Sequence, residues 1–466
     1  MRKWMAVWAG CALLAFTAGA AWAAEEAGAD SGGAVLVLGT GAVWAEEEAG
    51  TDSAGVVPMG PSYSVEATTS YHYVNNAYFG ADWGIQIPPG HAPSNFSWGE
   101  GLTRMRVNYG LPQGLWLSAG GVVMATVSTD YFGVDGAEDG LLDQLLVGAS
   151  GIGGSGLSVV AGRQDLQVGD GFLIGDGFRD SKAALWNIPL NFYDAVRADW
   201  AQGPWHALAF GARLSRSYGG DGVDPKGNQY GGEAGWSASE ERSLALGYFQ
   251  REDDGSTELD ARAFSLRGAL GARGFTLAGE LVAESGTAGG VDLKGRGGHL
   301  GLTYAFERTG EPYAQIEYLL FSGDDPETPE DEGYYPWEYR WTDWSKWYVG
   351  DLMASTLVFN DDSRIWKLEC GYSPLEDTSL RLLLHRISLD TGASYGGIPE
   401  GAGRDFADEA DLAVDQALGE RWSAWVMGGY VRPLDAAKAL VGEAASGQIF
   451  LSLTYKFDGT GGGSED

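Results

Sequence analysis

Residues 156–199 read GLSVVAGRQDLQVGDGFLIGDGFRDSKAALWNIPLNFYDAVRAD, and this stretch decides the fold. It opens with a segment, GLSVVAGRQDL, in which polar and apolar residues roughly alternate. A long loop rich in glycine and aspartate follows, and the chain then returns in a second alternating segment, NFYDAVRADW. Alternation with a period of two residues is typical of a β-strand that has two different faces. The stretch therefore predicts two strands joined by a long loop.

The second of these strands shows what its two faces meet. Val196, Ala198 and Trp200 share one face, while Arg197 and Asp199 share the other. An apolar stripe opposite a charged stripe fits a soluble sheet with one wet face. It also fits a membrane barrel with lipid outside and a polar lumen inside. The rest of the chain favours the barrel.

Length and composition agree with one large barrel. The chain has 466 residues, 73 of them glycine, with 12% aromatic residues and a net charge of -34. No region differs in composition enough to mark a second domain, and beyond the start no apolar run is long enough for a membrane helix. Cys11 lies in the predicted signal peptide, so Cys370 would be alone in the mature chain and no disulfide is expected.

The N-terminus predicts export. Residues 1–23 are typical of a secretory signal peptide, with a basic start, an apolar core and a small-residue cleavage site. Residues 24–61 are predicted to be a disordered acidic arm, in which AWAAEEAGADSGGAV (21–35) is nearly repeated as VWAEEEAGTDSAGVV (43–57). This duplicated leader leaves two cleavage sites open, one after Ala23 and one after Ala45. We predict an outer-membrane β-barrel over 62–457 and a flexible acidic tail over 458–466.

The predicted barrel contains eighteen segments of about the length that a tilted strand needs to cross an outer membrane. An even number is typical of a single-chain bacterial barrel with antiparallel strands. The segments are 63–75, 101–110, 114–127, 141–151, 156–166, 190–201, 205–216, 229–238, 241–251, 257–270, 274–285, 293–306, 312–322, 363–373, 378–389, 406–417, 421–433 and 446–457.

The connections alternate between short and long. Short ones such as LPQ, QGP and GAR consist of turn-forming residues, and we expect them on the periplasmic rim. The longest connections, which should lie outside the cell, are 76–100, 167–189, 323–362 and 390–405. Since every predicted periplasmic turn is short, any gating of the lumen is expected from the first three of these loops.

Two places carry a resemblance to a known family. GRQDLQVGDGFLIGDGFRD followed by FYDAVRADW resembles the signature region of the alginate export family of outer-membrane barrels, and so does the C-terminal third from Arg404 to Phe457. The resemblance implies an eighteen-stranded barrel that exports an anionic exopolysaccharide through a lumen lined with arginines and acids. The apolar face of GQIFLSLTYKF, ending in aromatic residues, resembles the terminal signal that the barrel-assembly machinery binds.

Parity along each strand predicts which side chains line the pore, since the apolar face should meet lipid. Arg163 fits the family motif, but strict parity places it with Leu157 and Val159, so it would need a β-bulge to face inward. The predicted substrate-binding, pore-lining residues are Arg104, Arg106, Arg163, Arg197, Asp199, Arg213, Arg267, Glu280, Glu317, Lys367, Glu369, Arg381, Glu409 and Asp411.

Arginines dominate the first half of this set and acids the second half, which predicts opposed walls and a transverse field across the lumen. The planar fork of an arginine can pair both oxygens of a uronate carboxylate. The other interpretation is that inward charges pair with one another and face water. In the long loops, the acids are either cation ligands or solvated charges. The aromatics there, including Tyr334, Tyr335 and Trp337, are expected either to stack on sugars or to form the interfacial girdle.

Two functions remain: a channel that exports an alginate-like anionic polysaccharide, and a passive porin for small solutes. No enzymatic activity, cofactor, metal or nucleic-acid partner is expected. None of the five histidines lies in a motif like those of barrel hydrolases, and the chain has no phosphate-binding loop. The expected partners are outer-membrane lipids, lipopolysaccharide and the assembly machinery. The expected state is a monomeric barrel in the outer membrane of a Gram-negative bacterium.

Overall fold

The structure, a computed structural model, describes residues 60–76, 95–128, 138–175, 193–215, 226–239, 241–253, 258–335, 337, 361–392, 401–440 and 442–460. The signal peptide, the duplicated leader and most of the predicted acidic tail lie outside these residues. The barrel itself begins and ends slightly beyond the expected bounds, at Gly60 and Thr460.

Almost all of the described chain is β-strand. A short 3-10 turn η2 (Pro112–Gly114) and the helix α3 (Asp435–Leu440) lie in connections. The strands are β1 (Gly60–Asn75), β2 (Asn95–Gly110), β3 (Leu115–Ser128), β4 (Glu138–Ile152), β5 (Leu157–Gln164), β6 (Tyr193–Gln202), β7 (Trp205–Ser215), β8 (Lys226–Ser239), β9 (Arg242–Asp253), β10 (Leu259–Ala272), β11 (Phe275–Ala288), β12 (Val291–Leu293), β13 (Arg296–Ala305), β14 (Tyr313–Phe321), β15 (Ser363–Leu375), β16 (Thr378–Leu389), β17 (Asp405–Ala417), β18 (Trp422–Pro433) and β19 (Ser446–Thr460).

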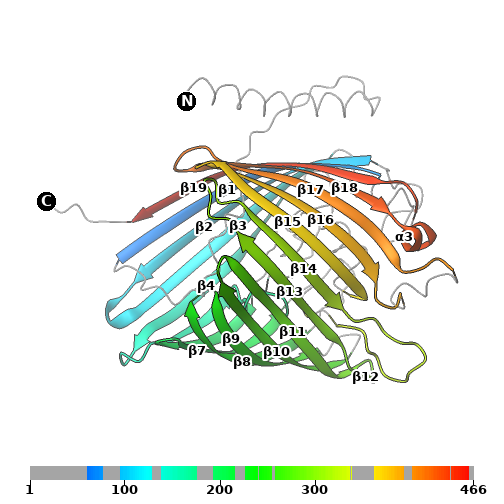
Figure 1. Cartoon of the computed structure of the whole chain (residues 1–466). Helices are drawn as coiled ribbons and strands as arrows, with labels where there is room; N and C mark the ends of the chain where they lie inside the picture. The colour runs from blue at the N-terminus through cyan, green and yellow to red at the C-terminus, as the bar shows by residue number, and fades with distance from the viewer. Residues whose placement is uncertain are drawn as a thin grey trace, which may run out of the picture. The chain divides into compact units, whose positions relative to one another are not determined.

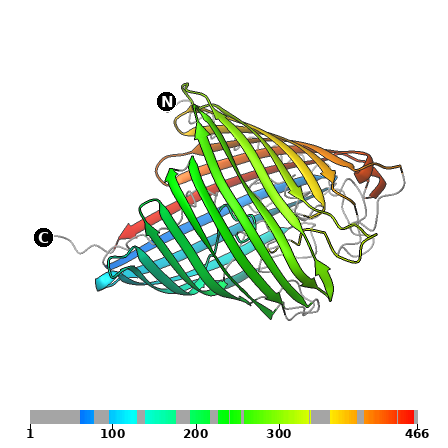
Figure 2. The ribbon, with the colours of Figure 1, turned by 60° about the horizontal axis from the view of Figure 1, so that its bottom comes forward.

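The strands form one closed antiparallel sheet in chain order (Figures 1 and 2). β1 pairs with β2 on one side and with β19 on the other, which closes the barrel. β12 and β13 both pair with β11, so together they make one interrupted strand and the barrel has eighteen strands. Closure satisfies the backbone groups that a free sheet edge would expose to lipid. The predicted fold class and strand number are confirmed.

The alternation of short and long connections has one exception. β11 and β12 are joined on the long-loop rim by Gly289 and Gly290 alone, with φ of 58° and 84°. Positive φ at both central residues of a tight hairpin turn favours glycine, which explains the pair at this position. The expected strict alternation is therefore wrong at this hairpin.

The outer face carries an apolar belt. Met105, Val107, Leu246, Phe264 and Leu281 are all more than half exposed although they are large and hydrophobic. Such a surface would be costly in water and is stable against lipid, as in other outer-membrane barrels. Within the described residues, no helix is long and apolar enough to span a membrane. The closed barrel with this belt is an outer-membrane protein of the Gram-negative type, as the sequence predicts.

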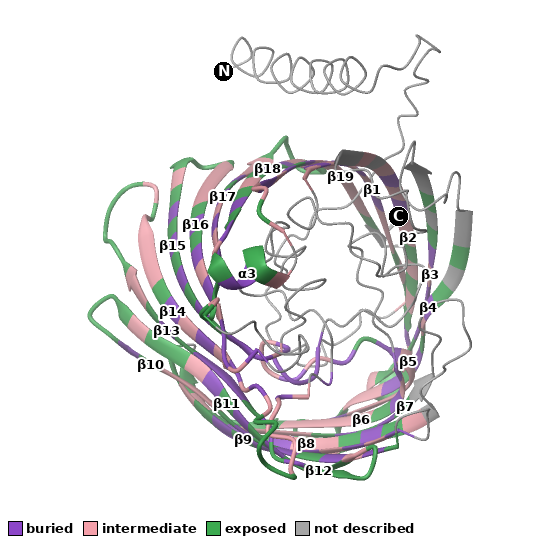
Figure 3. Ribbon diagram, turned by 90° about the vertical axis from the view of Figure 1, so that its right-hand side faces the viewer, coloured by how far each residue is buried: buried purple, intermediate pink, exposed green. Residues whose placement is uncertain are grey.

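The largest apolar cluster lies inside the barrel. Figure 3 shows ribbon within the ring of strands, including buried segments and α3 near the mouth. The cluster joins the loop after β5, the loop after β14 and inward side chains of the wall. α3 contributes Ala436 and Ala437, which are buried beside Phe406 and Ala407 of β17. The lumen is therefore partly filled by folded protein.

Candidate functional site

The loop that follows β5 turns into the lumen. Over residues 165–175 it buries Leu166, Phe172 and Ile174, with exposed fractions of 2% or less. Its shape is fixed locally, since the Val168 amide donates to the Ile174 carbonyl over 2.9 Å. Gly169 has a φ of 65°, and a Cβ at this position would lie 2.5 Å from Nε of Arg267 on the wall. Only glycine therefore fits this point of contact without displacing the arginine.

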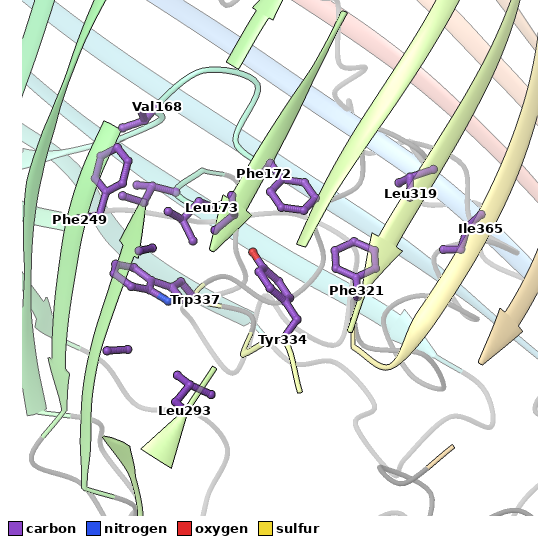
Figure 4. Packing of buried hydrophobic residues seen from close by; sticks show 14 of the residues in the cluster. Val168, Phe172, Leu173, Phe249, Leu293, Leu319, Phe321, Tyr334, Trp337 and Ile365 are labelled. Carbon is purple, nitrogen blue, oxygen red and sulfur yellow. The ribbon is translucent and has the colours of Figure 1, made fainter. Parts of the chain in front are cut away.

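Aromatic rings join this loop to the wall and to the loop after β14 (Figure 4). Phe172 stacks on Phe321 of β14, with ring centroids 5.5 Å apart and an interplanar angle of 9°. Its centroid is also 5.8 Å from that of Tyr334. Tyr334 and Trp337 are buried in the same cluster, so they belong neither to a sugar-stacking surface nor to the interfacial girdle. Burial raises the pKa of the Tyr334 hydroxyl well above its usual value.

Polar contacts attach both loops to the wall. Asp170 lies 2.8 Å from Nε2 of His299 on β13, and Asp165 lies 3.1 Å from Arg106 on β2. Burial acts to raise the pKa of Asp170, but the charge and hydrogen bond of His299, the Phe172 amide and the charge of Arg267 together lower it. The loop after β14 is held by Glu284, which accepts a hydrogen bond from the Tyr335 amide over 2.9 Å. We call residues 165–175 and 322–335, together with Trp337, the inner loops.

The inward arginines are each paired with a carboxylate. Arg104 lies 3.0 Å from Asp143, Arg197 lies 2.8 Å from Asp199, and Arg267 lies 2.5 Å from Glu233. With Arg106 and Asp165, these pairs neutralise the wall on which the sequence predicts a basic track. The prediction of separate basic and acidic walls is wrong because acids also lie beside the arginines.

Asp143 is a lumen residue that the sequence analysis missed. The register between β3 and β4 shifts between Gly120 and Val122, and this bulge turns Asp143 toward Arg104. A bulge breaks the alternation on which parity depends, so no simple sequence pattern would have found this residue. Asp165 was missed for another reason, because it lies just past the end of β5 in a loop.

The acidic residues of the predicted set also lie on the inner face. Glu280 accepts a hydrogen bond from Ser265 over 2.6 Å, and Glu317 lies 3.0 Å from Nζ of Lys367 and 2.9 Å from His299. The remaining residues continue along β15, β16 and β17: Glu369 with Tyr313 at 2.6 Å, Arg381 with Asp415 at 3.2 Å, and the buried Glu409 and Asp411.

Two predicted pore residues, Arg163 and Arg213, face outward. Arg163 lies opposite Leu145 of β4, a residue of the apolar belt, and opposite Asp194 of β6, to which its Nε donates over 3.0 Å. No bulge interrupts the pairing at Arg163, so its strict parity holds. Arg213 lies opposite Asp194 on the other side. On β7 the inward face is Phe210 and Ala212, because Phe210 packs against Phe249 at a centroid distance of 6.3 Å.

Comparison with known proteins supports the fold. The chain is similar to solved structures of outer-membrane porins of the OprD/Occ type from Pseudomonas aeruginosa. OccK9 (OpdG) has a TM-score of 0.56 and 14% identity, with 85% of this chain and 98% of that chain covered. OccK5 (OpdH) has a TM-score of 0.55 and 11% identity, with 86% of this chain and 98% of that chain covered. OprD has a TM-score of 0.54 and 10% identity, with 88% of this chain and 98% of that chain covered.

At such identities the likeness shows a shared fold. No family model matches the chain, and no curated protein matches it. The resemblance to the alginate export family is therefore supported only as far as an outer-membrane β-barrel.

Proposed function

We propose that this protein is a passive channel for small solutes whose lumen is narrowed by the inner loops. The observation that carries the proposal is the apolar cluster inside the barrel, in which Phe172, Phe321, Tyr334 and Trp337 are buried. Apolar side chains buried against the wall hold the inner loops in place and reduce the cross-section open to water. A barrel of eighteen strands is otherwise wide enough for an aqueous channel.

The charges of the lumen favour small cations over anions. The arginines of the inner face are matched by carboxylates, for example Arg197 by Asp199 and Arg267 by Glu233. The described inner face therefore has no excess of positive charge that would attract anions. The net charge of -34 for the whole chain acts in the same direction.

The polysaccharide exporter is the competing function. A sliding uronate polymer needs a continuous basic track and a wide path. Arg104, Arg106, Arg197 and Arg267 are already paired with carboxylates, and Arg163 and Arg213 lie on the outer face. The inner loops would also have to leave the lumen. These three features favour the small-solute channel.

Single-channel recording in planar bilayers tests the proposal. Under a gradient of potassium chloride, the reversal potential should have the sign of a cation-selective pore. Arg197→Gln should increase this selectivity, because it leaves the carboxylate of Asp199 without its cationic partner, while Arg262→Gln, a change on the outer face, should leave it unaltered. A closed barrel without conductance, or one that prefers anions, would contradict the proposal.

Uronate oligomers separate the two functions. The small-solute channel predicts that a uronate oligomer blocks the current no better than a neutral-sugar oligomer of equal length. Clear preference for uronate, lost in the double variant Arg106→Glu/Arg197→Glu, would instead support the exporter. Moderate salt is needed in this experiment, because it screens the long-range repulsion between the acidic protein and the oligomer.

A further inference from the structure

Three side chains on the inner faces of β16 and β17 form a compact group. His385 lies directly opposite Glu409 in the register, and Asp411 is the next inward residue of β17. One donor atom from each lies within 4.8 Å of the others. Their exposed fractions are 4%, 2% and 1%. One imidazole with two carboxylates is a donor set that suits divalent first-row transition metals.

In the part of the chain that the structure describes, the carboxylate of Asp411 is buried without the hydrogen bonds that a buried carboxylate usually accepts. Among the described residues, neither of its oxygens accepts a hydrogen bond. Nδ1 of His385 is 3.7 Å from its Oδ2, which is too long for a hydrogen bond. A buried carboxylate is costly unless it is paired or coordinates a metal. Two adjacent carboxylates such as Glu409 and Asp411 therefore require either a shared proton or a cation.

A second buried polar group lies in the same row of the sheet. Gln448 of β19 is 3% exposed, and neither its amide nitrogen nor its oxygen has a hydrogen-bond partner among the described residues. Between Asp411 and Gln448 in the register lies Gly429, which has no side chain. The row therefore contains two buried side chains with unsatisfied polar atoms and no bulk between them.

The neighbouring charges leave the site short of positive charge. Lys367 lies opposite His385 on β15, and its Nζ is 3.0 Å from Glu317 and 3.4 Å from Glu369. The ammonium group of Lys367 is therefore shared by two other buried carboxylates, Glu317 and Glu369. A divalent cation beside His385 would balance the two carboxylates on β17.

A similar group elsewhere in the lumen differs in having close contacts between its side chains and their neighbours. Donor atoms of Asp170, Glu280 and His299 also lie within 4.8 Å of one another. There, however, His299 contacts Asp170 and Glu317 at 2.8 and 2.9 Å, and Glu280 accepts from Ser265 at 2.6 Å. Direct contacts between the side chains account for this group, which attaches the inner loop to the wall.

We propose that His385, Glu409 and Asp411 bind one divalent transition-metal cation, with Zn²⁺ as the probe, between β16 and β17 in the lumen wall. The site goes beyond the proposed channel function and does not depend on it. The bound cation bridges two neighbouring strands and so stabilises the barrel at this place.

Metal titration of the refolded, tag-free mature barrel tests the proposal. After a chelator has been used and removed, elemental analysis should find one Zn²⁺ per chain, and chelator competition should give its affinity. Asp411→Asn and His385→Gln should each weaken binding by about tenfold or more. Asp415→Asn, on the same strand and face, and His299→Gln, in the similar group, should bind as the unchanged protein does. Cobalt absorption should report the histidine and carboxylate ligands.

Two outcomes would overturn the site. One is that the protein takes up no stoichiometric zinc. In that case Glu409 and Asp411 would share a proton, and the protein should show an infrared band of a protonated carboxyl group that is absent in Asp411→Asn. The other is that Asp411→Asn binds zinc as tightly as the unchanged protein. If His385→Gln fails to assemble, zinc binding by Asp411→Asn decides between these outcomes. This variant removes one charge from the buried pair Glu409 and Asp411 and should not impair folding.

Discussion

At the scale of single residues, the lumen is a set of charge pairs rather than a row of free cations. Arg267 illustrates this, since it contacts the buried Glu233, and a Cβ added at Gly169 would lie 2.5 Å from its Nε. Removing one member of such a pair leaves the other buried without compensation. The arginines therefore stabilise the wall, whatever solute passes.

We expect Arg267→Met to lower the free energy of unfolding by about 2 kcal/mol, because Glu233 would lose its charged partner in a partly wet lumen. Urea unfolding in lipid vesicles measures this change. In the double variant Arg267→Met/Glu233→Met most of the loss should be recovered, since no unpaired charge remains. Equal destabilisation by the single and the double variant would refute the role of the pair.

Cys370 tests which residues face lipid. It lies on the outer face of β15 with Trp366 and Leu368, while Lys367 and Glu369 between them point inward. A small charged thiol reagent added to intact membranes should therefore not label Cys370. The control is Lys294→Cys in a Cys370→Ser background, at an exposed position outside the strands, which should react quickly. Rapid labelling of Cys370 would mean that the face assigned to this strand is reversed.

At the scale of elements, we expect the inner loop 165–175 to narrow the channel. It is attached by stacked rings, by the Asp170–His299 contact and by the Asp165–Arg106 pair. None of these contacts is local in sequence, so the loop and the wall must be considered together.

Phe172→Ala should release much of this attachment. The ring is 2% exposed, and truncating a buried phenylalanine costs about 3 kcal/mol in a packed environment. The single-channel conductance should rise or become noisy as the loop leaves the wall, while the barrel stays assembled. Phe275→Ala, on the outer face, is the matched control and should not alter the conductance. Unchanged conductance in Phe172→Ala would show that this loop does not narrow the pore.

Acid should loosen the same loop. The pKa of Asp170 is lowered when the loop is docked, so the contact stabilises docking above the ordinary carboxyl pKa of about 4 and is lost as the pH falls through the lowered value. His299, Arg267 and Glu280 are the charged neighbours that face Asp170. Conductance should therefore be steady from neutral pH to about pH 5 and increase in stronger acid. In Asp170→Asn the conductance should already be raised at neutral pH.

At the scale of the whole molecule, stability comes from closure. The pairing of β1 with β19 leaves no free edge, so the barrel should resist SDS at low temperature and migrate more slowly after boiling. Leu453→Pro would remove a backbone donor inside β19, between partners Thr69 and Ala424, and should abolish the resistant form. Leu453→Ala should keep it. A helix-dominated circular dichroism spectrum, or recovery in the soluble periplasm, would contradict the architecture.

The sequence by itself determined the strands, their number and, for most of them, which face meets lipid. These features depend on alternation within about ten residues, which a single segment contains in full. The face of β15 that carries Cys370, Trp366 and Leu368 was predictable for this reason. So was the order of the strands, because neighbours in an antiparallel barrel are neighbours in sequence.

Only the tertiary structure decided what fills the lumen. The inner loop after β5 meets Phe321 and Tyr334, which lie far away in the chain, and no local pattern contains that contact. A different contact inside the barrel reverses the expectation for Arg213. β7 has apolar residues on both faces, so parity there was ambiguous until Phe210 packed inward against Phe249. Where folded protein packs against the inner face, both faces of the wall are apolar, one toward lipid and one toward protein. Hydrophobicity then no longer distinguishes lipid from lumen, and this is the physical reason that sequence reasoning failed where the channel is narrowed.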